Sequence, residues 1–265
     1  MPAPSASAAS PKPHSLLGIA LMLGAMAALP MIEIKADSLS KAAEAYSKMY
    51  AFPDHPLYDG ALYKLGWTYY RIDQFQKGVE AFAKLLDYYV AQSKKTGKPP
   101  TGEVWPEAIQ YTAISFADEK WGGIEKAKAF FAGLGGRSYE AEIFTRLGDI
   151  FFDQTKYAAA VAAYKHVLAK DPLAPGAPRL QAKIVQAWSR DRQFEKEQSE
   201  REILVASYGE QSAWQSRNKG DPELVKEVRD LSEKSLVRAA SFHHTQAQAF
   251  KQQGKVDLAI LEYKV

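Results

Sequence analysis

Apolar residues recur every three or four positions in two neighbouring stretches, which are separated by a short polar break at residues 72–74. This spacing places the apolar side chains on one side of an α-helix. The stretches carry, respectively, Leu62, Leu65, Gly66, Tyr69 and Tyr70, and Phe75, Gly78, Val79, Phe82 and Leu85. Glycine inside a helix costs about 1 kcal/mol relative to alanine, so Gly66 and Gly78 indicate a close crossing of two backbones. Residues 61–86 therefore predict an antiparallel helix pair with small residues at its contact.

The same order of small and bulky residues recurs further along the chain. Counted from Gly66, the pattern continues with Tyr69, Phe75, Gly78 and Phe82. The same offsets from Gly148 give Phe151, Tyr157, Ala160 and Tyr164, and those from Ala247 give Phe250, Val256, Ala259 and Tyr263. A copy that starts at Val185 keeps Trp188 and Phe194 but has Glu197 and Arg201 at the last two places. In that copy we expect looser or rotated helix packing.

This pattern resembles the tetratricopeptide repeat, a helix–turn–helix unit of about 34 residues. The residues that carry the resemblance are Leu65-Gly66, Tyr69, Gly78 and Phe82; Leu147-Gly148, Phe151, Ala160, Tyr164 and Pro172; and Phe250, Gly254, Ala259 and Tyr263. The resemblance implies an all-α fold, an α-solenoid of antiparallel helix pairs in which each unit packs on its neighbours. The copies are unevenly spaced, which predicts irregular loops between the repeats.

The spacing divides the chain into an N-terminal segment, 1–35, and a helical repeat array, 36–265. We expect half a unit at 38–53, with one helix over 38–50, and units at about 57–92, 105–135, 139–172 and 179–209. A long helix at 222–244 then runs into a truncated unit at 240–265. Exposed loops are expected at 93–103 and 212–221, and the glycines at 133–136 predict the end of a helix. Incomplete units at both ends suggest a fragment of a longer bacterial cell-envelope array, with open apolar ends.

The N-terminal segment has the layout of a secretory signal. Lys12 and His14 precede the uncharged run Leu16–Ile32, and the small residues of 25–27 fit a cleavage site. A membrane anchor and a buried or disordered segment are the alternatives. Cleavage predicts an exported protein of the periplasm or cell envelope, whereas the absence of export predicts a cytoplasmic one. Any membrane association is expected through this segment alone, if it is not cleaved.

Composition and motifs give no support for catalysis or for nucleic-acid binding. The net charge is only +3, with 34 basic and 31 acidic side chains, and there is no cysteine. The one histidine pair, His243-His244, points in two directions about 100° apart on a helix, which does not suit one metal ion. We therefore expect no catalytic residue, cofactor, metal or small-molecule substrate, and a protein or peptide as the partner rather than nucleic acid.

The first helix of each pair has one side that does not pack inward. These sides form the candidate binding face, because in this family that concave face often holds partner peptides. Its residues are Tyr63, Trp67, Tyr70, Arg71, Asp149, Phe152, Asp153, Gln186 and Arg190. Aromatic residues beside arginine are typical of binding hot spots, although Trp67 and Tyr70 could instead pack on the neighbouring unit.

The expected function is a non-enzymatic scaffold for protein–protein interaction, in cell-envelope assembly or a surface machinery. Two alternatives stay open. One is the non-catalytic repeat region of a larger enzyme or enzyme accessory. The other is a structural protein that self-associates through its open repeat ends.

Overall fold

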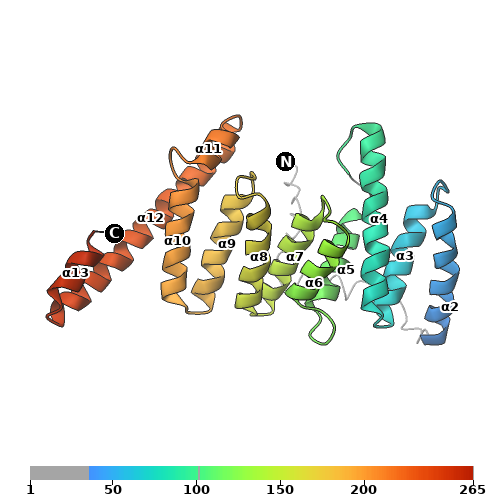
Figure 1. Cartoon of the computed structure of the whole chain (residues 1–265), viewed down its shortest axis with the longest axis horizontal. Helices are drawn as coiled ribbons and strands as arrows, with labels where there is room; N and C mark the ends of the chain where they lie inside the picture. Colours follow the sequence, from blue (N-terminus) through green and yellow to red (C-terminus); the bar gives the residue numbers. More distant parts are fainter. Residues whose placement is uncertain (1–35, 101, 265) are drawn as a thin grey trace, which may run out of the picture.

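The helices of this protein follow one another in a single row (Figure 1). The computed structural model describes residues 36–100 and 102–264, and this part of the chain contains helices and no strand. The helices are α2 (Ala36–Ser47), the short 3-10 helix η1 (Lys48–Ala51), α3 (Tyr58–Arg71), α4 (Phe75–Thr96), α5 (Trp105–Ala117), α6 (Ile124–Gly133), α7 (Glu140–Asp153), α8 (Tyr157–Lys170), α9 (Ala177–Arg190), α10 (Phe194–Tyr208), α11 (Ala213–Asn218), α12 (Pro222–Gln252) and α13 (Val256–Glu262). The predicted all-α solenoid of antiparallel helix pairs is confirmed.

Packing runs mainly between helices that are close in sequence. The pairs α3–α4, α7–α8, α9–α10 and α12–α13 each pack together, and α4, α8 and α10 pack in turn on α5, α9 and α12. The largest apolar cluster therefore extends as a continuous layer from Leu62 in α3 to Ala187 in α9. Each unit covers its apolar side with the next unit, as expected for a repeat protein.

Two glycines let the first and second helices of a pair cross closely. A Cβ atom on Gly66 would lie 2.6 Å from Phe82 Cε1, and one on Gly148 would lie 2.4 Å from Tyr164 Cε1. Both distances are far below a van der Waals contact, so the aromatic rings lie directly against the glycine backbones. The close approach that the sequence predicted at the helix crossing is confirmed for both pairs.

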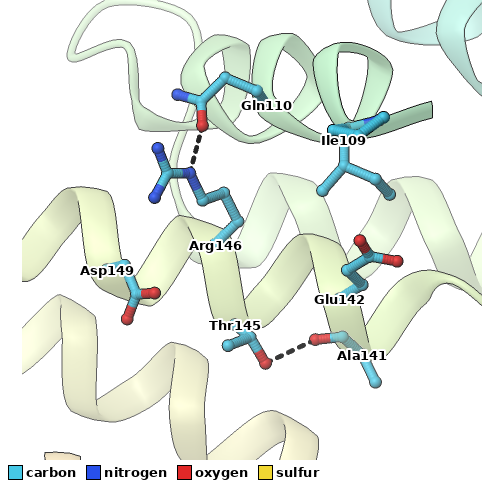
Figure 2. A pocket seen from close by; sticks show the side chains of 8 residues that line it. Ile109, Gln110, Ala141, Glu142, Thr145, Arg146 and Asp149 are labelled. Atoms are coloured by element: carbon cyan, nitrogen blue, oxygen red, sulfur yellow. Dashed lines mark hydrogen bonds between the residues drawn. The ribbon is translucent and has the colours of Figure 1, made fainter. Parts of the chain in front are cut away.

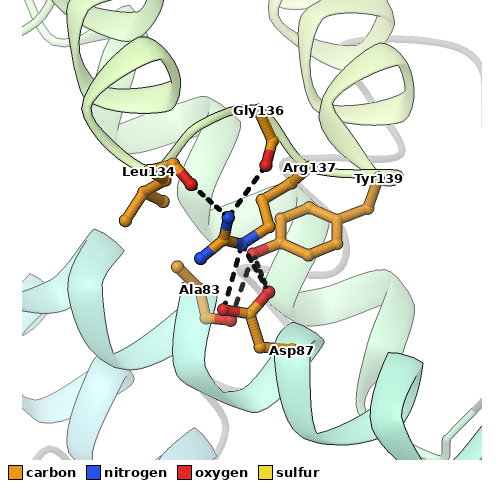
Figure 3. A network of polar contacts seen from close by, with 6 residues as sticks. All are labelled: Ala83, Asp87, Leu134, Gly136, Arg137 and Tyr139. Atoms are coloured by element: carbon orange, nitrogen blue, oxygen red, sulfur yellow. Dashed lines mark hydrogen bonds and ion pairs between the residues drawn. The ribbon is translucent and has the colours of Figure 1, made fainter.

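A polar network ties α4 to the segment between α6 and α7 (Figure 3). Arg137 Nε donates to both carboxylate oxygens of Asp87, at 2.8 and 3.1 Å, and the Tyr139 hydroxyl donates to the same carboxylate at 2.9 Å. Another Arg137 nitrogen donates to the carbonyls of Leu134 and Gly136. The hydrogen bond to Asp87 raises the pKa of Arg137, which stays charged. This network fixes the linker that follows the short helix α6.

Three local predictions need correction. Helix α2 begins at Ala36 and ends at Ser47, so the expected single helix over 38–50 is replaced by α2 and η1. Helix α4 continues to Thr96, and Lys94 and Lys95 in its last turn favour this extension because cations stabilise a helix C-terminus. The loop that was expected from residue 93 therefore begins only at Gly97, which has a left-handed φ of 69°.

The third correction concerns 212–221, which was expected to be a loop but contains α11. The Ser212 side chain caps this helix by accepting a hydrogen bond from the Gln215 backbone. Trp214 is fully buried, and its indole nitrogen donates to the Ala174 carbonyl at 2.8 Å. One buried tryptophan therefore stabilises a turn of helix in a stretch whose other residues are mostly polar.

The glycines at 133–136 end a helix, as predicted. Helix α6 has Gly133 as its last residue, and Gly135 and Gly136 follow with positive φ angles of 74° and 81°. Glycine adopts this left-handed conformation without the steric cost that other residues incur.

Candidate partner-binding face

The exposed sides of α3, α5, α7 and α9 form one surface, which we call the first-helix face. Helix α5 contacts both α3 and α7. A salt bridge of 2.6 Å between Lys183 of α9 and Asp149 of α7 continues the surface to α9. Residues of α3 and α5 and of the turn that follows α7 also line one hollow together. The sequence-predicted binding residues lie on these helices, but they do not share one environment.

The α3 end of this face is aromatic and already partly packed. The rings of Tyr70 and Tyr111 lie 5.2 Å apart, and Tyr63 lies 6.3 Å from Phe82. Burial raises the pKa of both Tyr63 and Tyr70 above that of free tyrosine. These two residues therefore support the neighbouring helices while keeping part of their surface accessible.

Trp67 and Arg71 form a more accessible pair at the same end. The Arg71 guanidinium lies over the Trp67 ring, 5.1 Å from its centroid. Trp67 is half-buried and Arg71 is exposed. A cation over an aromatic ring is attracted by the ring's negative face, so the pair presents a flat, preorganised contact surface.

A hollow of about 520 Å³ lies between α5 and α7 (Figure 2). Pro106, Ile109 and Ala141 supply apolar surface to it, and Glu142, Arg146 and Asp149 supply charge. The Arg146 side chain is held across the hollow by a hydrogen bond from its Nε to Gln110 Oε1. The Trp105 indole nitrogen donates to Glu142 Oε2 at 3.1 Å.

Two predicted carboxylates lie one helical turn apart on α7, with different partners. Asp149 accepts hydrogen bonds of 2.6 Å from both the Tyr164 hydroxyl and Lys183 Nζ. Asp153 accepts none from the residues that the structure describes and is half-buried. Burial raises the pKa of Asp153, and the nearby Asp149 raises it further. The positive charges near Asp153 are thus too few to offset its burial and its repulsion by Asp149.

The remaining predicted residues are divided between packing and solvent. The Phe152 ring lies 5.4 Å from Tyr157 in a T-shaped arrangement and adjoins the core, so its role is largely structural. Gln186 and Arg190 are exposed on α9. Neither residue lines the hollow between α5 and α7.

A second hollow of about 490 Å³ lies at the C-terminal end of α5, beside the turn that follows α7. Tyr70 and Phe75 line its aromatic side, and Glu119 and Lys156 form a salt bridge of 2.8 Å at its polar side. Gln110, Ile114 and Ala117 are spaced by four and three residues, so α5 presents the same side to both hollows.

Sequence reasoning missed the contribution of α5 to this face. Ile109, Gln110 and Tyr111 were not among the predicted binding residues, because residues 105–135 match the repeat pattern poorly. Arg146 and Lys183 were missed as well. The outward-facing positions of α5 could have been found by applying to it the helical spacing used for α3. That spacing would have indicated Gln110 and Ile114, which are four residues apart.

The described residues contain no cluster of three or more histidine, aspartate or glutamate side chains that could hold a metal ion. His243 is instead bound between two carboxylates. Its Nδ1 lies 2.7 Å from Glu262 of α13, and its Nε2 lies 2.9 Å from Glu202 of α10. This histidine therefore connects α12 to both α10 and α13.

Comparison with known proteins identifies one repeat directly. Residues 60–90 match the family model described as tetratricopeptide repeat. Comparison with curated proteins gave no match. A solved structure described as Rap protein complexed with competence and sporulation factor is similar, with 17% identity and a TM-score of 0.32, over 86% of this chain and 68% of that chain. The matched repeat and the stacked helix pairs indicate a scaffold for protein–protein interaction, a fold that typically lacks catalytic groups.

Proposed function

We propose that this chain, as a tetratricopeptide-repeat protein, binds an extended segment of a partner protein along its first-helix face and does not catalyse a reaction. The observation that carries the proposal is the hollow between α5 and α7, with its apolar surface and fixed polar groups. Hollows that combine apolar surface with a few oriented polar groups favour ligand binding. The Trp67–Arg71 pair adds the residue types that dominate binding hot spots.

The setting that we propose is the bacterial cell envelope, in assembly or a surface machinery. The support is the sequence of the apolar run 16–32, which lies outside the described residues. No helix among the described residues is long and apolar enough to cross a membrane. A fusion of residues 1–35 to a reporter that is active only after export tests this setting. An inactive reporter would contradict it.

Site-specific photocrosslinking tests the binding face. A photoreactive amino acid replaces Trp67 or Glu142 on the first-helix face or, as a control, the exposed Ala158 of α8. We expect the same partner to be crosslinked from both first-helix positions and not from Ala158. Recovery from Ala158 alone would show that the partner binds elsewhere.

Self-association remains a second candidate because α13 exposes much apolar surface. Val256, Ile260 and Leu261 are 57%, 47% and 60% exposed. Exposed apolar patches often mark interaction sites. Light scattering over a concentration series tests this candidate, since a constant monomer mass would exclude it.

A further inference from the structure

The two hollows of the first-helix face carry an excess of negative charge, although the whole chain has a net charge of +3. Their charged lining residues are the carboxylates Asp118, Glu119, Glu142 and Asp149 and the cations Arg146 and Lys156. Asp153 and Lys183 lie beside the hollow between α5 and α7, and their opposite charges cancel. The lining of the two hollows is therefore acidic within a basic protein, which favours a basic partner there.

Among the carboxylates at these hollows, Asp153 differs from Glu119 and Asp149 in its ion pairing. Glu119 is paired with Lys156 and Asp149 with Lys183, at 2.8 and 2.6 Å. Asp153 follows Asp149 by one turn of α7 and has no ion pair among the described residues. The upward shift of its pKa, to which Asp149 contributes, shows that nearby Arg146 and Lys183 do not compensate for its burial. A carboxylate in this state gains most from an added cation.

We infer that the hollow between α5 and α7 receives an apolar side chain of an extended partner segment, while Asp153 pairs with a lysine or arginine of the same segment. This inference rests on the proposed function, because it names the chemistry of the segment that the face binds. The apolar surface of Ile109 and Ala141 takes the first side chain, and the unpaired carboxylate takes the second.

The geometry limits how far apart the two side chains can be. Asp153 lies about 18 Å along α7 from Ala141, which is twelve residues away, since each helical residue rises about 1.5 Å. Side chains two positions apart in an extended segment point the same way and are about 6.6 Å apart. The segment therefore has its basic residue four or six positions from the apolar one, which corresponds to about 13 to 20 Å.

Selection from a displayed library of random peptides on the full chain tests the inference. We expect enrichment of peptides with an apolar residue four or six positions from lysine or arginine. Fluorescence anisotropy then gives the affinity of an enriched synthetic peptide for three variants. Asp153→Asn removes the charge, Thr145→Phe fills the hollow, and Asp54→Asn removes an exposed carboxylate in the loop before α3 as a control.

Asp153→Asn is expected to weaken binding about tenfold, the loss expected for one charge-assisted hydrogen bond. The loss should shrink at high salt, which screens the ion pair. Thr145→Phe should weaken binding at least as much, and Asp54→Asn should not change it. Circular dichroism establishes that each variant is folded.

The outcomes separate this inference from the proposed function. Enriched peptides that are acidic, or whose affinity is unchanged in Asp153→Asn but falls in Thr145→Phe, would overturn the inference and leave the binding face in place. Peptides whose affinity is unchanged in both variants and in Trp67→Ala would overturn the proposed function as well.

Discussion

The helix pairs α7–α8 and α9–α10 occupy neighbouring places in the row but are joined by different chemistry. In α7–α8, the fully buried Tyr164 ring lies against Gly148. The equivalent places in α9–α10 are Val185 and Arg201, and Arg201 bonds to Glu197 of its own helix rather than filling a gap. The first joint has a closely fitted aromatic ring at this place, although Glu140 of α7 also pairs with His166 and Lys170 of α8. The second has a charged side chain there, and we call it the polar joint.

The polar joint is built around a buried carboxylate. Glu200 is 6% exposed, accepts a hydrogen bond of 2.7 Å from the Gln181 amide and forms a salt bridge of 2.5 Å with Lys165 of α8. This pairing adds little net stability because the buried Glu200 carboxylate loses its hydration, while solvent screens the Lys165 ammonium, which is 53% exposed. The comparison teaches that two helices of a pair can also be held together by polar side chains. Such a pair gains less stability from the burial of apolar surface. We therefore expect the C-terminal pairs to open before α7–α8.

Tyr164→Ala should have the largest effect on this comparison. The change removes a fully buried aromatic ring and its hydrogen bond to Asp149, and should destabilise the array by about 3 to 5 kcal/mol. Urea denaturation followed by helical circular dichroism measures this loss. The control is Phe194→Ala in α10, which should cost under about 0.5 kcal/mol because that ring is 60% exposed. Similar losses in the two variants would contradict the distinction between the joints.

Gly148→Ala should come next. The added Cβ would lie 2.4 Å from a Tyr164 ring that is buried and held at its hydroxyl by Asp149. Overpacking of this kind costs about 1 to 3 kcal/mol. Gly176→Ala is the matched control, because no atom outside its immediate neighbours lies within 4 Å of a Cβ there. Thermal denaturation of the two variants gives the difference, and an equally stable Gly148→Ala protein would show that the crossing is not close.

The apolar joints could be predicted from the sequence, and the polar ones could not. Small residues at fixed helical spacing specify a crossing, which is why the crossing at Gly66 and Gly78 was predicted and its copy at Gly148 was recognised; the aromatic rings that lie against Gly66 and Gly148 were found in the structure. The partner of a polar residue depends on how neighbouring helices are rotated, and spacing within one helix does not give this rotation. Gln181, Lys165 and Glu200 come from three helices, so their meeting was not predictable.

The candidate site shows the same limit. The sequence indicated Tyr70 and Asp149 as outward-facing residues, and each lines a hollow of the first-helix face. It did not indicate Gln110, whose bond to Arg146 joins two units. Whether these residues bind a partner remains a prediction, because helical periodicity shows which side a residue occupies and not what it contacts.

Gln181→Ala tests the polar joint itself. The change removes the amide that donates to Glu200 and leaves Lys165 as the remaining charge partner. A lost hydrogen bond to a buried charge should cost about 1 to 2 kcal/mol. Gln186→Ala, at an exposed position on the same helix, is the control and should be neutral. Urea denaturation of both variants measures the difference, and a neutral Gln181→Ala would mean that packing alone fixes α9 against α10.

The smallest expected effect is the pH dependence of the C-terminal pair. The hydrogen bond with Glu262 raises the pKa of His243 above its usual 6.5, and Glu202 contributes further. A raised pKa in the folded state means that the stabilisation is complete below the unfolded value and is lost as the pH rises through the folded value. Only the protonated ring can donate to both carboxylates at once.

Amide hydrogen exchange in α13 measures this pH effect. Opening of residues 256–262 should become easier by up to about 1 kcal/mol as the pH rises from 6 past the raised pKa, a magnitude typical of accessible ion pairs. Exchange rates are first corrected for their intrinsic dependence on pH. His243→Gln should remove the dependence, whereas His55→Gln, in the loop before α3, should leave it unchanged. A wild-type protein whose α13 protection does not vary with pH would show that the protonated histidine does not stabilise the packing of α13 on α12.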